Sequence, residues 1–205
     1  MKKSLESLSR KTFIDFSKDY IDYLKTLLDN LDHQAINSCF EVLESARINN
    51  NKIFIIGNGG SASTASHIGN DFGLASLKTS HKKKSIPYKI ISLTDNNALI
   101  TALGNDNGFD NIFVEQLKVL FEKGDVLISI SASGNSKNLI TACEWVNEND
   151  GTTIGWLGFD GGKLKNICSQ SIIINSPIGE YAPVEDIHLI INHILVSWMH
   201  INLIK

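Results

Sequence analysis

The sequence contains few of the residues that mark specialised classes of protein. Among its 205 residues there are three cysteines, and the formal net charge is −3. Cys39, Cys143 and Cys168 are an odd number at wide and irregular spacing, which argues against a disulfide framework or a zinc knot and favours a reducing, cytoplasmic compartment. The small net charge gives no electrostatic case for a nucleic-acid partner.

Long apolar runs are also missing. No run reaches the length of a membrane span, and the residues after Met1 lead into amphipathic rather than uniformly apolar sequence. We therefore expect a soluble protein with no membrane partner. The apolar content of 42% is enough to form a core. We interpret residues 1–205 as a single domain in which residues 1–50 form a helical extension.

Two glycine-rich loops match neither of the common nucleotide-binding motifs, G-x-G-x-x-G and G-x-x-x-x-G-K-[ST], which disfavours a nucleotide ligand. The loops, residues 57–61 (GNGGS) and 131–136 (SASGNS), each follow an apolar run typical of a buried strand. Glycine permits close backbone approach, and the first turn of a following helix offers unpaired N–H groups to an anion. Two such loops with serine hydroxyls predict a sugar-phosphate site. For either loop alone, the alternative is a tight turn without a ligand.

Apolar spacing predicts the order of the elements. Two helices over residues 13–31 and 36–46 come first. Strands follow at 53–56, 88–93, 125–131, 152–157 and 171–175, with helices at 61–75, 96–122, 136–149, 161–167 and 184–203. The strands are apolar without alternation, as expected for parallel strands covered on both faces. We predict an α/β fold: a doubly wound, flavodoxin-like sandwich with a five-stranded parallel sheet, flanking helices, and ligands at the carboxyl ends of the strands.

Four titratable residues on two predicted helices are candidates for proton transfer or metal binding. His67 and Asp71 lie four residues apart, so their side chains share one helix face. Glu185 and His193 lie eight apart, about 12 Å along a helix axis, and they meet one ion only if both reach inward or if Glu185 sits at an unwound helix start. His188 is a competing partner for Glu185. For each histidine alone the alternative is a surface or core role, which is weakest for His67 because its helix begins at the predicted ligand.

Several motifs and their order along the chain resemble the sugar isomerase (SIS) domain, specifically its phosphoheptose isomerase branch. They cover nearly the whole chain: GNGGS at 57–61, Asn105-Asp106, GDVLISISASGNS at 124–136, GFDGG at 158–162 and EDIH at 185–188. The resemblance implies a cytoplasmic homotetramer, with active sites between subunits, that interconverts sedoheptulose 7-phosphate and D-glycero-D-manno-heptose 7-phosphate on the route to surface heptose.

Matching motif to motif gives the site residues that the resemblance implies. Contacts to the phosphate and the sugar fall on Asn58, Gly59, Gly60, Ser61, Asp106, Ser131, Ser133, Asn135, Ser136 and Glu185. A site for one zinc ion falls on His67, Asp71, Glu185 and His193. Isomerisation through an enediol needs a base near the acidic carbon and an acid or cation at the carbonyl oxygen. We assign Asp71 as the base and His193 as its acid/base partner.

The chain departs from the branch at several of these positions. Asp71 and Glu185 stand where the branch has glutamate and glutamine, Ala75 stands where it has arginine, and Ala182-Pro183 replaces an acidic and a basic residue. Because an aspartate is one methylene shorter, its carboxylate is displaced. Two alternatives to isomerisation of a heptose or related sugar phosphate therefore remain. One is a tetrameric scaffold, as in a close relative that associates with the bacterial replication initiator, and the other is a sensor that binds a sugar phosphate without turnover.

The last predicted helix has an apolar face that is too wide for a surface helix. That face contains Leu189, Ile190, His193, Ile194, Trp198 and Ile201. Together with the two leading helices it is expected to form the core of a homo-oligomer. Burial within a monomer is the alternative.

Overall fold

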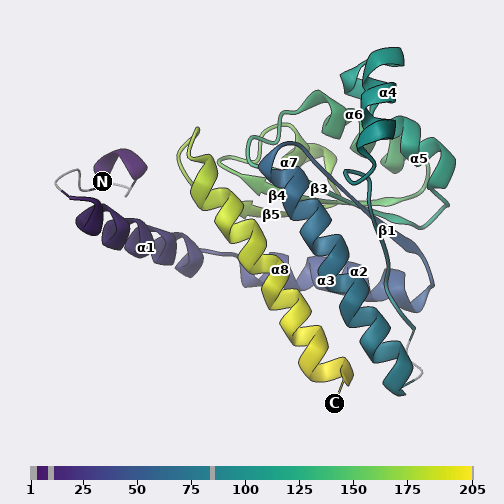
Figure 1. The fold of residues 1–205 in the computed structure, drawn as a ribbon, viewed down its shortest axis with the longest axis horizontal. Coiled ribbons are helices and arrows are strands. Elements are labelled where there is room, and N and C mark those ends of the chain that lie inside the picture. Colours follow the sequence, from purple (N-terminus) through teal and green to yellow (C-terminus); the bar gives the residue numbers. More distant parts are fainter. Residues whose placement is uncertain (1–3, 9–11, 84–85, 205) are drawn as a thin grey trace.

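The computed structural model describes residues 4–8, 12–83 and 86–204. Its centre is a parallel sheet of five strands in the order β2-β1-β3-β4-β5 (Figure 1). The strands are β1 (Lys52–Gly57), β2 (Lys89–Ser92), β3 (Val126–Ser131), β4 (Thr152–Gly158) and β5 (Gln170–Ile174). The chain moves outward from β1 to β2, crosses back to β3 and continues to β5. This reversal next to β1 is the doubly wound order that the sequence predicts, so the fold class is confirmed.

Helices cover both faces of the sheet. One layer contains α1 (Phe13–Asp29), α2 (His33–Ile48), α3 (Gly60–Lys83) and α8 (Tyr181–Ile204), and the other contains α4 (Asn97–Asp106), α5 (Val114–Leu120), α6 (Lys137–Glu148) and α7 (Leu164–Ile167). Short 3-10 helices occur at Leu5–Ser7 and Phe109–Asn111. Among the described residues, no helix is long and apolar enough to cross a membrane.

The two layers bury alternate residues of each strand. In β1, Ile53 and Ile55 pack with α1, α2, α3 and α8, whereas Phe54 and Ile56 pack with the helices of the other layer. All four side chains have zero exposure. A strand buried on both faces needs an apolar residue at every position, which explains why the run shows no alternation.

Helix lengths differ from the predicted ones more than strand positions do. The helix expected over 61–75 continues to Lys83, and the stretch expected as helical over 96–122 is divided by the 3-10 turn at Phe109–Asn111. The Asn96 side chain caps α4 by accepting from the Leu99 backbone N–H at 3.1 Å, and this cap starts the helix.

The N-terminal segment is attached to the start of α8. Glu180 is buried, and its carboxylate accepts from the Tyr23 hydroxyl at 2.5 Å and from the Leu5 backbone N–H at 2.7 Å. Tyr20 donates at 2.6 Å to Asp186 on α8, six residues after Glu180. A buried carboxylate needs such donors, so these bonds fix the N-terminal segment next to the beginning of α8.

Candidate active site

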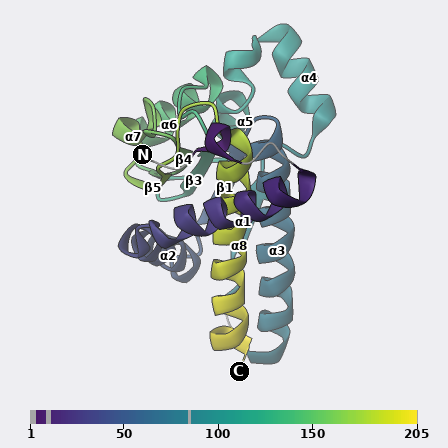
Figure 2. The same ribbon diagram turned by 90° about the vertical axis from the view of Figure 1, so that its left-hand side faces the viewer.

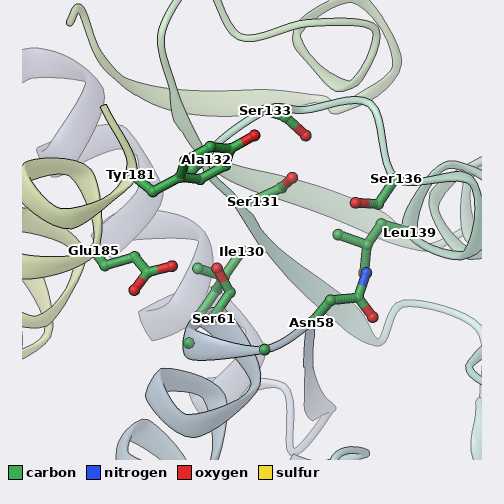
Figure 3. Close-up of a pocket in the computed structure, with 12 residues that line it drawn as sticks. Asn58, Ser61, Ile130, Ser131, Ala132, Ser133, Ser136, Leu139, Tyr181 and Glu185 are labelled. Atoms are coloured by element: carbon green, nitrogen blue, oxygen red, sulfur yellow. The ribbon is translucent and has the colours of Figure 1, made fainter. Parts of the chain in front are cut away.

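A pocket of about 310 Å³ opens at the carboxyl edge of the sheet. It lies between the loops that follow β1 and β3 and the first turns of α8. Twelve residues line it: Asn58, Gly59, Gly60, Ser61, Ile130, Ser131, Ala132, Ser133, Ser136, Leu139, Tyr181 and Glu185. Figure 3 shows the hydroxyls of Ser131, Ser133 and Ser136 and the Glu185 carboxylate facing a common space. Both glycine loops of the sequence therefore meet at one site.

The first loop connects β1 to α3. Gly59 has φ +55, a left-handed conformation that glycine adopts without steric cost. The Asn58 amide exchanges two hydrogen bonds, of 3.0 and 2.9 Å, with the amide of buried Asn138 in the first turn of α6. This amide pair joins the first loop to the helix that follows the second, so the two loops are held as one unit.

The second loop connects β3 to α6. Ser131 Oγ accepts from the Gly134 N–H at 3.0 Å. Asn135 Nδ2 donates to the Ser133 carbonyl at 2.8 Å, and Asn135 Oδ1 accepts from the Lys163 N–H at 3.2 Å. Asn135 thus shapes the loop and does not line the pocket. Ser131, Ser133 and Ser136 line it.

Glu185 forms the opposite wall. A Cβ atom on Gly60 would lie 2.3 Å from Glu185 Oε2, so the carboxylate fills the space that Gly60 leaves open. Gly60 begins α3, and a carboxylate near a helix N-terminus is stabilised by the helix dipole. Half-exposed Tyr181, from the same end of α8, completes this side of the pocket.

A second polar cluster lies further along the same two helices, which run side by side (Figures 1 and 2). His67 Nε2 lies 3.0 Å from Asp71 Oδ2 on α3. His193 Nε2, on α8, lies 3.2 Å from His67 Nε2 and 3.7 Å from Asp71 Oδ2. The exposed side-chain fractions are 44% for His67, 53% for His193 and 21% for Asp71, so the carboxylate is the shielded centre and the imidazoles remain open to a ligand.

The donors of this cluster fit a zinc ion. One ligand atom each from His67, Asp71 and His193 lie within 4.8 Å of one another. Two nitrogens that bind the same tetrahedral zinc ion at about 2.0–2.1 Å are separated by roughly 3.4 Å, and the two Nε2 atoms here are 3.2 Å apart. Two imidazoles and one carboxylate leave an open position, as in catalytic zinc sites.

The structure does not bring every predicted residue to one point. Glu185 is outside the group formed by His67, Asp71 and His193, because eight residues of helix separate it from His193. Asp106 is exposed at the end of α4 and does not line the pocket. His188, the competing partner of Glu185, is fully buried beside Trp156, with ring centroids 6.5 Å apart.

Three residues of the site were missed by the sequence analysis. Tyr181 lines the pocket, Asn138 holds Asn58, and fully buried Asn192 donates to Asp71 at 2.8 Å. A signal for Asn192 exists in the sequence: it is the single amide in an otherwise apolar stretch, residues 189–192 (LIIN), directly before His193. Nothing comparable marks Asn138.

Fold and site together define an α/β protein with a donor-rich ligand pocket at the carboxyl edge of a parallel sheet. The family model of the SIS domain matches residues 17–158. The chain is 40% identical to the phosphoheptose isomerase of Nitratiruptor sp. over 78% of this chain and 79% of that one, and 38% identical to that of Clostridium acetobutylicum over 83% and 84%. The solved phosphoheptose isomerase of Neisseria gonorrhoeae superposes with a TM-score of 0.80, at 27% identity over 92% of this chain and 98% of that one. The chain therefore belongs to the SIS domain family, in its phosphoheptose isomerase branch, and it is an isomerase.

Proposed function

We propose that the chain interconverts an aldose and a ketose phosphate, specifically D-sedoheptulose 7-phosphate and D-glycero-D-manno-heptose 7-phosphate. The observation that carries this proposal is the pairing of two sites on the same two helices: a pocket of hydroxyl and N–H donors, and a carboxylate–histidine cluster. The names of the relatives support the same reaction class.

The phosphate is assigned to the serine side of the pocket. Ser61, Ser131, Ser133 and Ser136 supply hydroxyl donors there, and α3 and α6 begin beside them. Helix N-termini attract phosphate through unpaired N–H groups and the helix dipole. The Glu185 side of the pocket favours the sugar over the phosphate, because a carboxylate repels phosphate and accepts hydrogen bonds from sugar hydroxyls. Of its two predicted roles, the geometry favours the sugar contact over the metal ligand.

The reacting carbons are assigned to the cluster. His67 lies six residues beyond Ser61 on α3, which is about 9 Å along the helix. An extended sugar chain bound by its terminal phosphate spans a distance of this order. The site therefore fits a substrate whose carbonyl lies far from its phosphate, as in a 7-phosphate.

Proton transfer is assigned to Asp71 and His193. Asp71 removes the proton from C1, next to the C2 carbonyl of the open-chain ketose, and the protonated carboxyl then delivers a proton to C2 of the resulting enediol. His193 exchanges protons with the two oxygens, and its Nε2 lies 3.7 Å from Asp71 Oδ2. His67 orients the carboxylate through its contact of 3.0 Å. Zinc held by His67, Asp71 and His193 would polarise the carbonyl oxygen in place of a proton from His193, because an imidazole nitrogen that binds zinc carries no proton.

The cellular setting follows as part of the same proposal. We infer a cytoplasmic homotetramer in which residues 1–50 contribute contacts between subunits within a single-domain chain. Exposed apolar side chains on α1, α3 and α8 support the assembly. Asp106 does not reach the pocket of its own subunit, so its sugar contact stays a prediction.

Proton exchange followed by NMR tests the proposal. The purified protein is incubated in D₂O with sedoheptulose 7-phosphate, with and without added Zn²⁺. We expect deuterium at the carbon next to the carbonyl and appearance of the aldose. Shifts of ligand signals without exchange would contradict turnover and indicate a sensor.

Two variants test the acid/base assignment. Asp71→Asn and His193→Ala are expected to lower kcat by about 10²- to 10⁴-fold, the usual contribution of a positioned acid or base. The matched control is His200→Ala, because His200 is an exposed histidine of the same helix and is expected to keep wild-type kcat. Full turnover in both Asp71→Asn and His193→Ala would make the assignment wrong.

A further inference from the structure

A buried amide holds the carboxylate at the centre of the cluster. Asn192 on α8 has zero exposure, and its Nδ2 donates to Asp71 Oδ2 at 2.8 Å. The same oxygen lies 3.0 Å from His67 Nε2 and 3.7 Å from His193 Nε2. The other oxygen, Oδ1, has a long contact of 3.4 Å with Asn70 Nδ2. Oδ2 is therefore held by the Asn192 amide and the His67 imidazole, with His193 nearby, and Oδ1 is the less constrained oxygen.

An asparagine at the buried position 192 destabilises the fold relative to an apolar residue. Residues of α8 and α3 close to Asn192 and Asp71 in the sequence are apolar, and Ile191, Leu195, Ile68 and Phe72 belong to one buried cluster. Asn192 Oδ1 is buried without a hydrogen-bond partner among the described residues. An unpaired buried acceptor destabilises the folded state, and an apolar side chain of similar size would avoid that cost. The benefit of the amide must therefore lie in its bond to Asp71.

The bond controls a torsion that is otherwise soft. The terminal torsion of an aspartate is broad and nearly two-fold, so an unrestrained carboxylate samples many orientations. Asn192 lies directly before His193 in α8, so one helix supplies both the amide behind the carboxylate and the imidazole in front of it. The amide keeps Oδ2 turned toward α8 and leaves Oδ1 for the substrate.

We propose that Asn192 is a positioning residue for the isomerisation, acting by fixing the Asp71 carboxylate through Nδ2–H···Oδ2. The proposal rests on the role of Asp71 given under the proposed function. One substitution is therefore expected to have two opposite effects. Removing the amide eliminates an unsatisfied buried acceptor, which favours stability, and it releases the Asp71 carboxylate, which lowers kcat.

The experiment compares kinetics and thermal unfolding of the full-length protein with sedoheptulose 7-phosphate as the probe. Asn192→Leu is expected to lower kcat by about 10- to 100-fold, the effect of a displaced catalytic group or a lost supporting bond. KM is expected to stay within about twofold, because the amide touches Asp71 and not the substrate. The midpoint of thermal unfolding is expected to be unchanged or raised.

Two further variants complete the comparison. Asn202→Leu is the matched control: Asn202 is an exposed asparagine of α8 whose amide donates to the Trp198 carbonyl at 2.9 Å, and its kcat should equal that of the wild type. Asn192→Ala removes the amide without adding volume. The cavity it leaves lowers the unfolding midpoint in any case, so its kcat and KM decide the question if Asn192→Leu does not fold.

The outcomes separate this inference from the proposed function. An active wild type with a disabled Asp71→Asn variant, but with full kcat in Asn192→Leu, overturns the inference alone. For Asn192→Leu, a loss of kcat that accompanies a lowered unfolding midpoint also overturns it, because that result describes a purely structural residue. A wild type without turnover overturns the proposed function and the inference with it.

Discussion

Gly134 shows how closely the second loop is fitted to its surroundings. Its φ is +62, and a Cβ atom there would lie 2.0 Å from the Gly161 carbonyl oxygen. Gly59 in the first loop has a similar φ of +55, but a Cβ atom would meet nothing within 4 Å. The two glycines thus share one conformation and differ in available space.

That difference gives a paired prediction for stability. Gly59→Ala is expected to lower the free energy of unfolding by about 1–2 kcal/mol, the cost of a left-handed L-residue. Gly134→Ala is expected to lower it by about 3 kcal/mol or more, because a backbone clash is added. Urea unfolding measures both values. Equal losses in the two variants would show that the loop relaxes and that the contact with Gly161 sets no limit.

At the residue scale, sequence reasoning identified local pairs better than long-range ones. His67 and Asp71 are one helical turn apart, so their contact could be predicted from spacing alone. His193 lies 126 residues after His67, and its place came from the resemblance. Asn192 could not be paired with Asp71 in this way, because the two are 121 residues apart, and the sequence shows only an amide within an apolar stretch.

At the scale of elements, α8 organises the site. Its start carries Tyr181 and Glu185 into the pocket, and its middle carries His193 to the cluster. Between them, fully buried His188 packs toward the sheet beside Trp156 on β4. A titratable residue, His188, is therefore buried between α8 and the sheet, and the proposed reaction does not use it.

Burial lowers the pKa of His188 from 6.5 to about 4, although the Leu157 backbone opposes the shift. As pH falls, the unfolded chain gains this proton near pH 6.5 and the folded chain only near pH 4. The associated stability is therefore complete above about pH 6.5 and is lost progressively down to about pH 4. The full loss is about 3 kcal/mol at 1.36 kcal/mol per pKa unit.

Urea unfolding at several pH values between 7 and 4 checks this expectation. His188→Leu is expected to show a smaller loss of unfolding free energy over the same range, because the buried imidazole is gone while all carboxylates remain. The difference between the two curves isolates His188 from those carboxylates. Parallel curves for wild type and variant would contradict the assignment.

The elements themselves were largely predictable. Strands buried on both faces require apolar residues at every position, and this requirement is visible in runs such as Ile53–Ile56. Helix ends were less predictable, because capping and tertiary packing decide them. The long extension of α3 to Lys83 is an example: the apolar pattern weakens after residue 75, and α3 continues beside α8 (Figure 2).

At the scale of the molecule, large apolar side chains of α1, α3 and α8 remain exposed. On α3 and α8 the exposed fractions are 57% for Leu77, 46% for Ile194 and 56% for Trp198, and on α1 that of Phe13 is 82%. Ile194 and Trp198 also line an apolar groove of about 220 Å³ with residues of α2. An exposed apolar groove of this kind is typical of an interface, which supports the proposed homotetramer.

Assembly and activity should fail together when this surface is charged. Trp198→Glu is expected to convert a tetramer, four chains of 22.6 kDa or about 90 kDa, into smaller species, because burying an unpaired carboxylate in an interface is strongly unfavourable. Light scattering coupled to gel filtration measures the mass. Val119→Glu is the matched control, since Val119 is 82% exposed on α5 in the other helical layer and should leave the mass unchanged. Trp198 lies five residues beyond His193 on α8, and we expect the interface to extend over the half-exposed cluster, so kcat should fall with the mass. A wild type that elutes as a monomer at micromolar concentration would contradict the tetramer while leaving the single-chain site as described.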